Sequence, residues 1–98
     1  MKRIVKMKFK EDQVNVFLDL FEKKRDAIAA FQGCRHLDLL RDKEDLCIFF
    51  TYSIWDGPAD LDAYRHSTLF KELWAQTKIL FAARAEAWSI NTEWSSGL

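Results

Sequence analysis

The sequence predicts an α+β domain in which four strands form an antiparallel sheet and helices cover one of its faces. Residues 47–55 are β-branched or aromatic for most of their length and stop abruptly at Gly57-Pro58, which is typical of a buried central strand. Elsewhere, apolar residues recur either at alternate positions or at helical spacing. The resulting order is strand, helix, strand, strand, helix, strand, and that order defines the fold class.

The first strand and helix follow from alternation and charge. Residues 2–9 alternate between apolar and charged side chains, which indicates a strand with one solvent-exposed face. Glu11 and Asp12 are suited to begin a helix, because negative charge is favourable at a helix N-terminus. The apolar stripe of this helix consists of Val14, Phe17, Leu18, Phe21 and Ile28. Gly33 is suited to the left-handed conformation that ends a helix.

The remaining elements complete the pattern. Residues 34–41 are predicted to form the second strand, and the charged residues 42–45 connect it to the central strand in a hairpin. A helical pattern begins at Pro58 and runs through Trp74, and Ser67-Thr68 is expected to kink it or divide it into two helices. The last strand is expected at about residues 82–91. This is the ferredoxin-like βαββαβ arrangement, with helices on one face of an antiparallel sheet.

Alternation gives the central strand two chemically different faces. We expect the first face, with Ile48, Phe50, Tyr52 and Ile54, to pack under the helices. The second face carries Cys47, Phe49, Thr51, Ser53 and Trp55. A chain of 98 residues has hardly enough helix to cover both. We therefore expect the second face to meet a partner subunit, a ligand or both.

Length and composition limit the number of domains and the kinds of partner that this protein is expected to have. One domain is expected over residues 1–98, with a core at about 2–91 and a C-terminal tail at 92–98. Fifteen basic and fifteen acidic residues balance, so no net charge steers the chain to nucleic acid or anionic lipid. The two cysteines form no disulfide framework, and no signal peptide or membrane span is recognised. We expect a cytoplasmic protein with neither nucleic acid nor membrane as a partner.

No cofactor or metal is expected. His36-x-Asp38 together with His66 is the sharpest metal hypothesis, because two histidines and one carboxylate can hold non-haem iron. We favour the alternative that His36 and Asp38 are solvent-exposed residues of a half-exposed strand, since His66 is expected on a different element. The three glycines are scattered and form no phosphate-binding loop for a flavin or nicotinamide. Cys34 and Cys47 are interpreted as small core residues rather than nucleophiles.

One histidine is a candidate general base. Asp62 and His66 are four residues apart on the second helical region, so the carboxylate could orient the imidazole. The competing interpretation is a half-buried histidine near a helix break, and we place it first. Trp55, Trp74 and Trp88 are first of all core or interface residues, but their number also fits an aromatic-walled pocket.

Two motifs together resemble a known family. They are Phe31-x-Gly33-Cys34 after the first helix, and Phe50-x-Tyr52-x-x-Trp55 leading into Ala59-x-Leu61-x-Ala63-Tyr64-x-His66-Ser67 and Phe70. This pattern resembles the antibiotic biosynthesis monooxygenase (ABM) family of dimeric α+β barrels, over about residues 2–91.

The resemblance implies a homodimer and a pocket. Two sheets would pack face to face, with the C-terminal strand reaching the partner and with Trp88, Ile90 and Trp94 near the interface. The sheet of the partner subunit would then cover the face that carries Phe49 and Trp55. A pocket would lie between each sheet and its helices and hold a small aromatic or hydrophobic ligand.

The resemblance also implies a choice of activities. Monooxygenase members oxidise phenolic or quinol-like substrates without a metal or flavin, and Trp55 matches their retained tryptophan, whereas Thr51 stands where some have asparagine. The haem-degrading branch would use positions that correspond here to Lys6 or a neighbour, Tyr64 and Trp74. The axial histidine is missing, so haem degradation is disfavoured.

The sequence is therefore consistent with two functions. The first is a cofactor-independent monooxygenase that oxidises a phenolic or quinol-like compound, with His66 as the catalytic base or hydrogen-bonding partner. Its substrate-binding residues would be Phe49, Thr51, Tyr52, Trp55, Tyr64 and Trp74. The alternative is a non-catalytic dimeric module that binds or senses a small hydrophobic molecule. A polar group facing an enclosed cavity would favour the enzyme, whereas a purely apolar lining would favour the binding module.

Overall fold

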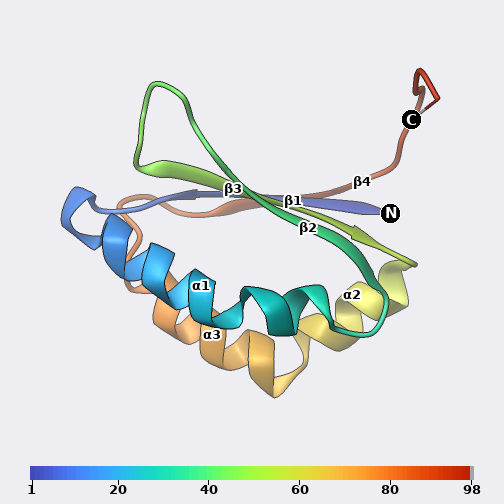
Figure 1. The fold of residues 1–98 in the computed structure, drawn as a ribbon, viewed down its shortest axis with the longest axis horizontal. Helices are drawn as coiled ribbons and strands as arrows, with labels where there is room; N and C mark the ends of the chain where they lie inside the picture. Colours follow the sequence, from blue (N-terminus) through green and yellow to red (C-terminus); the bar gives the residue numbers. More distant parts are fainter. Residues whose placement is uncertain (98) are drawn as a thin grey trace.

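The computed structural model describes residues 1–97 as two layers, an antiparallel sheet with the helices on one face (Figure 1). The strands are β1 (Lys2–Lys8), β2 (Cys34–Arg41), β3 (Ile48–Trp55) and β4 (Glu86–Ile90). The helices are α1 (Val14–Ala29), α2 (Pro58–Arg65) and α3 (Thr68–Lys78), and a short 3-10 turn, η1 (Glu11–Gln13), precedes α1. The strand order in the sheet is β2-β3-β1-β4. The predicted ferredoxin-like fold is therefore confirmed.

Most element boundaries agree with the sequence, and one differs. The predicted helix break is present, because Ser67 caps α3 by accepting a hydrogen bond from the backbone N–H of Phe70 at 3.1 Å. β4 is shorter than expected and begins at Glu86 rather than near Ala82. The chain before it makes only an isolated bridge between Phe81 and Phe9. No helix within residues 1–97 combines the length and apolarity needed to cross a membrane.

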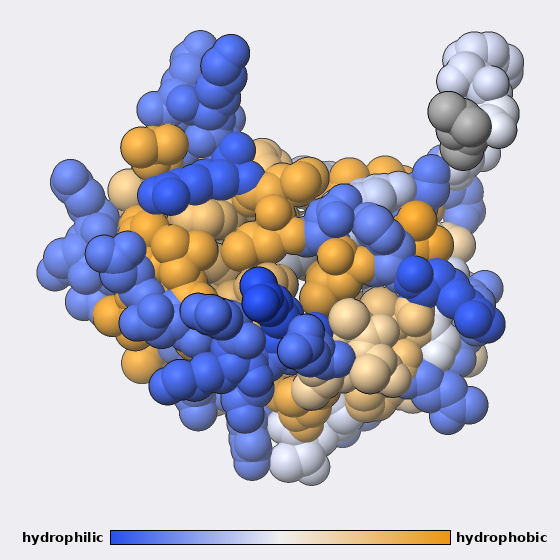
Figure 2. Space-filling view, in the orientation of Figure 1, coloured by the Kyte–Doolittle hydropathy of each residue, from blue (hydrophilic) through white to orange (hydrophobic). Residues whose placement is uncertain are grey.

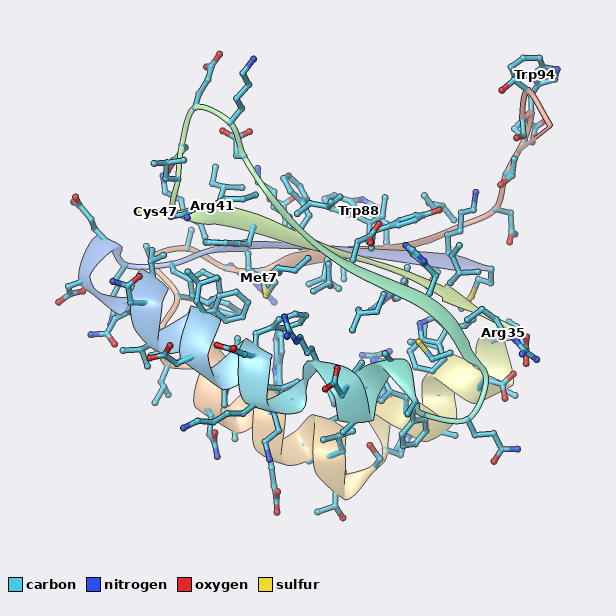
Figure 3. All side chains as sticks on the ribbon, in the orientation of Figure 1. Met7, Arg35, Arg41, Cys47, Trp88 and Trp94 are labelled. Atoms are coloured by element: carbon cyan, nitrogen blue, oxygen red, sulfur yellow. The ribbon has the colours of Figure 1, made fainter. Side chains whose placement is uncertain are left out.

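The structure reverses the expected assignment of the two sheet faces. Phe49 and Trp55 lie under the helices with 1% and 2% of their surface exposed. They share this inner face with Val5 and Met7, because Met7 pairs with Phe49 and Val5 with Thr51. Figure 3 shows the side chain of Met7 on the helix side of the sheet. The residues expected under the helices lie instead on the helix-free face: Ile48, Phe50, Tyr52 and Ile54. Alternation shows which residues share a face, but it does not show which face the helices cover.

Aromatic contacts hold α1 against one end of the sheet. The ring of Phe9 stacks on that of Phe17 with 4.1 Å between centroids, and Phe17 meets Phe49 edge-on at 5.4 Å. Such pairs add to the free energy already gained by burying the rings. The outward side of α1 is hydrophilic, whereas hydrophobic atoms show along the seam between helices and sheet (Figure 2).

The turn between α1 and β2 packs against α2. Gly33 has φ +87°, the left-handed conformation predicted for it. A Cβ at this position would lie 2.5 Å from the Cβ of Asp60, so the glycine also allows a close approach to α2. Gly33 therefore helps to set where α2 lies under the end of β3.

The helix-free face carries apolar side chains that are open to solvent, beside Lys2, Lys6 and Lys8 of β1. Trp88 and Ile90 of β4 are 45% and 40% exposed, and Leu40 of β2 is similarly open. Register places Trp88 beside Ile4 on this face. The β2–β3 connection and the segment after β4 both rise on this side of the sheet (Figure 1). The open face is thus bounded at both ends by projecting chain.

Candidate functional site

A cavity of about 450 Å³ lies between the inner face of the sheet and the helices. Its lining comes from β1, β3, β4 and all three helices, together with Leu37 of β2. Most of this lining is apolar or aromatic. The polar side chains on it are Arg3, Thr51, Ser53, Tyr64, Arg65 and Thr77. The size and character are those of a small-molecule site.

Trp55 is a fixed wall of this cavity. Its indole N–H donates a hydrogen bond to the hydroxyl of Ser53 at 3.0 Å. Its ring stacks on Tyr64 with 5.1 Å between centroids and an interplanar angle of 28°. Its backbone N–H donates to the carbonyl of Met1 at 2.8 Å. Because both the backbone and the ring are held, the indole face is presented to the cavity in one orientation.

The break between α2 and α3 positions the other aromatic wall. The Ser67 hydroxyl donates to the carbonyl of Tyr64 and accepts from the N–H of Phe70, so one side chain joins the two helices. Tyr64 then meets Phe70 edge-on at 5.2 Å, and Phe70 stacks on Trp74 one turn later at 5.9 Å. The predicted helix break thus aligns three aromatic side chains along the cavity.

The hydroxyl groups of the lining fall into two kinds. Ser53 accepts from Trp55, and Thr77 donates to the carbonyl of Leu73 at 2.7 Å. The hydroxyls of Thr51 and Tyr64 make no hydrogen bond to any group within residues 1–97, and both oxygens keep some accessible surface, because no fully buried side-chain oxygen or nitrogen there lacks a partner. These two hydroxyls are therefore available to a ligand in the cavity.

The Tyr64 hydroxyl is a donor rather than a base. Burial raises its pKa well above the ordinary value, and the nearby Cys34 raises it further. A neutral phenol at neutral pH can donate a hydrogen bond to an anionic oxygen. The site therefore favours a ligand that presents an acceptor or an anion toward Tyr64.

Four of the residues predicted for substrate binding meet at this cavity, and two do not. Thr51, Trp55, Tyr64 and Trp74 all line it. Phe49 belongs to the aromatic cluster under α1, away from the lining. Tyr52 lies on the helix-free face, where its ring meets His36 edge-on at 5.9 Å. Adjacent strand residues face opposite sides, so Thr51 and Tyr52 could not both enter one cavity.

His66 lies outside the cavity. It follows the last residue of α2 and is exposed, and its Nδ1 lies 2.7 Å from the backbone carbonyl oxygen of Asp62. The expected partner, the carboxylate of Asp62, is not the group that it contacts. His66 is therefore not among the residues that line the cavity, and its role as a base stays a prediction.

The residues of the iron hypothesis do not converge. His36 Nε2 lies 2.9 Å from the Asp38 carboxylate on β2, on the helix-free face. His66 lies in the helix layer on the other side of the sheet. Within residues 1–97, no group of three or more histidine, cysteine or acidic side chains could hold a metal ion.

Sequence reasoning missed two charged residues at the site, Arg3 and Arg65. Arg3 has the same parity on β1 as Val5 and Met7, so a charge at an inward position was visible in the sequence. Arg65 is four residues after the buried Leu61 and shares its helix face. Both signals were present, but alternation alone does not show that the inward space is a cavity.

Comparison with known proteins assigns the chain to a family. The antibiotic biosynthesis monooxygenase family model matches residues 1–76. The chain therefore belongs to this family, as its motifs predicted. No curated protein sequence matches it.

Solved structures show the same fold at low sequence identity. A Nitrosomonas europaea protein named for this monooxygenase family has a TM-score of 0.87 at 15% identity, covering 95% of this chain and 98% of its own. A conserved protein from Methanosarcina mazei Go1 has a TM-score of 0.83 at 22% identity, covering 88% and 86%. Rv0793 from Mycobacterium tuberculosis has a TM-score of 0.81 at 20% identity, covering 96% and 97%. These likenesses establish the fold.

The ionisation of Tyr64 can be observed in isolation. The chain has two tyrosines, so Tyr52→Phe leaves Tyr64 alone. Because burial raises its pKa, the phenolate absorbance of this variant should appear only above the pH, about 10, at which free tyrosine titrates. The unfolded chain loses the proton first, so the free energy of unfolding should fall as the pH rises past that value. A phenolate signal at the pH of free tyrosine, with the fold intact, would show that Tyr64 is solvated.

Proposed function

We propose that this protein is a cofactor-independent monooxygenase that oxidises a phenolic or quinol-like aromatic compound. The observation that carries the proposal is the pair of free hydroxyls, Thr51 and Tyr64, on an otherwise aromatic cavity. Family membership supports the reaction class. The lining offers hydroxyls and guanidiniums rather than the imidazole, thiolate and carboxylate groups that bind catalytic metals.

The cavity suits a flat, mainly apolar substrate. Its volume of about 450 Å³ accommodates two or three fused rings with most of their surface buried. Trp55 and Trp74 offer broad aromatic surfaces, and Thr51 on β3 and Tyr64 on α2 bring a hydroxyl from each layer. A ring system between the layers can thus meet aromatic faces and hydrogen bonds together.

The proposed chemistry takes its electrons from the substrate. A deprotonated phenol gives one electron to O2, the resulting radical and superoxide combine at a ring carbon, and the peroxide loses water. The phenolic O–H and one ring C–H supply the two hydrogens of the water, so the phenol plus O2 gives a quinone plus H2O. Tyr64 donates to the substrate oxyanion, which lowers the free energy of the reactive anion in a dry site.

The same cavity also supports the second candidate, a binding module without turnover. Among residues 1–97, no carboxylate or imidazole lines it, so the site supplies no evident base. Under the first proposal, the substrate must arrive ionised or lose its proton to solvent. Under the second, the ligand is held through the same contacts and leaves unchanged. Oxygen consumption separates the two.

We further propose that the active form is a homodimer joined through the helix-free face and the C-terminal segment. The exposed side chains of Leu40, Trp88 and Ile90 lie on a sheet face that no helix of the chain covers. Burying apolar surface of this kind yields roughly 25 cal/mol per Å². A second copy of the same face is self-complementary about a twofold axis. Trp94, 81% exposed on the projecting segment, could then reach the partner (Figure 3).

Oxygen uptake with polycyclic phenols and quinols, in the presence of a metal chelator, tests the enzymatic proposal. Tyr64→Phe removes one hydroxyl and keeps the ring, and we expect it to lower kcat by about 10–100-fold, as loss of one oxyanion donor does. His66→Ala is the control and should keep full activity, because His66 lies outside the cavity.

Two results would count against this mechanism. Equal turnover of the Tyr64→Phe and wild-type proteins would remove Tyr64 from the chemistry. Ligand binding without oxygen uptake across the whole substrate series would favour the binding module.

Sedimentation tests the dimer. Wild-type protein at micromolar concentration should sediment as a dimer, and Trp88→Glu should shift it to monomer by burying a charge in the interface. Ile79→Glu is the matched control, because Ile79 is 67% exposed at the end of α3 in the helix layer. A wild-type monomer, or an equal response to both substitutions, would contradict this assembly.

A further inference from the structure

Two arginines stand where the cavity opens to the surface. An outer groove bordered by Met1, Asp56 and Pro58 shares three lining residues with the cavity: Arg3, Leu61 and Arg65. We call these three residues the rim. Arg3 comes from β1 and Arg65 from the last turn of α2, so the two layers each bring one guanidinium to the same opening.

Neither rim arginine has an acidic partner within residues 1–97. The guanidinium of Arg3 donates to the hydroxyl of Ser89 at 3.0 Å, which leaves its other N–H groups free. The nearest groove carboxylates are those of Asp56 and Asp62. Asp56 is held by two hydrogen bonds from Arg35, at 2.6 and 2.9 Å, and Asp62 forms no ion pair with either rim arginine.

The two positive charges act on each other. Burial lowers the pKa of Arg3 below its ordinary value, and the charge of Arg65 lowers it further. Arg65 near the C-terminus of α2 interacts favourably with the helix dipole, which accounts for its presence on that helix. The dipole gives no reason for a second arginine on β1, pointing to the inner face at the same opening.

We propose that the rim arginines bind an anionic substituent, a carboxylate or a group of similar charge, on the aromatic ligand of the cavity. The aromatic body would occupy the cavity, and the anion would lie between Arg3 and Arg65, relieving their repulsion. Guanidinium N–H groups suit the two oxygens of a carboxylate. This inference rests on the proposed function, because it assumes that the cavity holds an aromatic ligand.

The geometry also separates this role from that of Tyr64. The Tyr64 ring is buried against Trp55 and Phe70 and does not border the outer groove, whereas Arg3 and Arg65 do. A ligand with a phenolic oxygen at one end and a carboxylate at the other would meet both. The substrate class is therefore narrowed from any phenol to an aromatic hydroxy acid.

Calorimetric binding of two matched probes tests the inference. The probes are 2-naphthoate and its neutral analogue 2-naphthylmethanol. We expect the naphthoate to bind about tenfold more tightly, because charge-assisted hydrogen bonds are the stronger kind. Arg3→Gln and Arg65→Gln should each remove about that factor for naphthoate and leave the alcohol unaffected. Arg65→Lys should retain part of the affinity, and the matched control Arg25→Gln, exposed on α1, should change neither probe.

The outcomes distinguish a failure of the proposed anion site from a failure of the proposed aromatic ligand site in the cavity. If both probes bind equally, and neither rim variant changes naphthoate binding, the anion site is wrong and the aromatic cavity stands. If neither probe binds, the cavity as a ligand site fails, and the anion site fails with it. Added salt should weaken naphthoate binding alone, and a salt-independent preference for naphthoate would also contradict the role of the arginines.

Discussion

Aromatic packing at the two ends of the inner sheet face is the constraint on which the site depends. At one end, the stacked rings of Phe9 and Phe17 attach α1 to the sheet, and at the other, Trp55 stacks on Tyr64 of α2. Between these contacts the layers do not close completely, and a cavity of about 450 Å³ remains. The cavity is therefore a consequence of how the layers are joined, and its walls are the same rings that join them. Substitutions that loosen either cluster should affect stability and ligand binding together.

The one-sided cover of helices gives the two sheet faces different tasks. The inner face combines a cavity with hydroxyls from Thr51 and Tyr64, whereas the outer face carries exposed apolar side chains and is bounded by projecting chain. A ligand in the cavity and a second subunit on the outer face, both as proposed above, would therefore not compete for the same surface. Since neighbouring residues of β3 point to opposite faces of the sheet, Thr51 lines the cavity while Tyr52 lies on the outer face. One strand thus supplies residues to both proposed functions.

The sequence predicted the element order, the bounds of β2, the break at Ser67 and four of the cavity residues. It did so because alternation, helical spacing and capping are local signals. It placed the helices on the wrong face of β3. Alternation shows which residues of a strand share a face, but which face the helices cover becomes clear only once Met7 is known to pair with Phe49. The sequence also could not show where the side chain of His66 would lie. Its spacing from Asp62 was correct, but the ring turns to the backbone carbonyl of that residue at the exposed end of α2.

The central claim is that ligands enter between the sheet and the helices. The four tryptophans divide between the two surfaces, with Trp55 and Trp74 on the cavity and Trp88 and Trp94 away from it. Titration with 2-naphthol, followed through the four indole N–H signals in a nitrogen–proton correlation spectrum, therefore tests the claim most directly. We expect the signals of Trp55 and Trp74 to shift and those of Trp88 and Trp94 to stay in place. Shifts confined to Trp88 and Trp94 would contradict the account, because the ligand would then occupy the open sheet face.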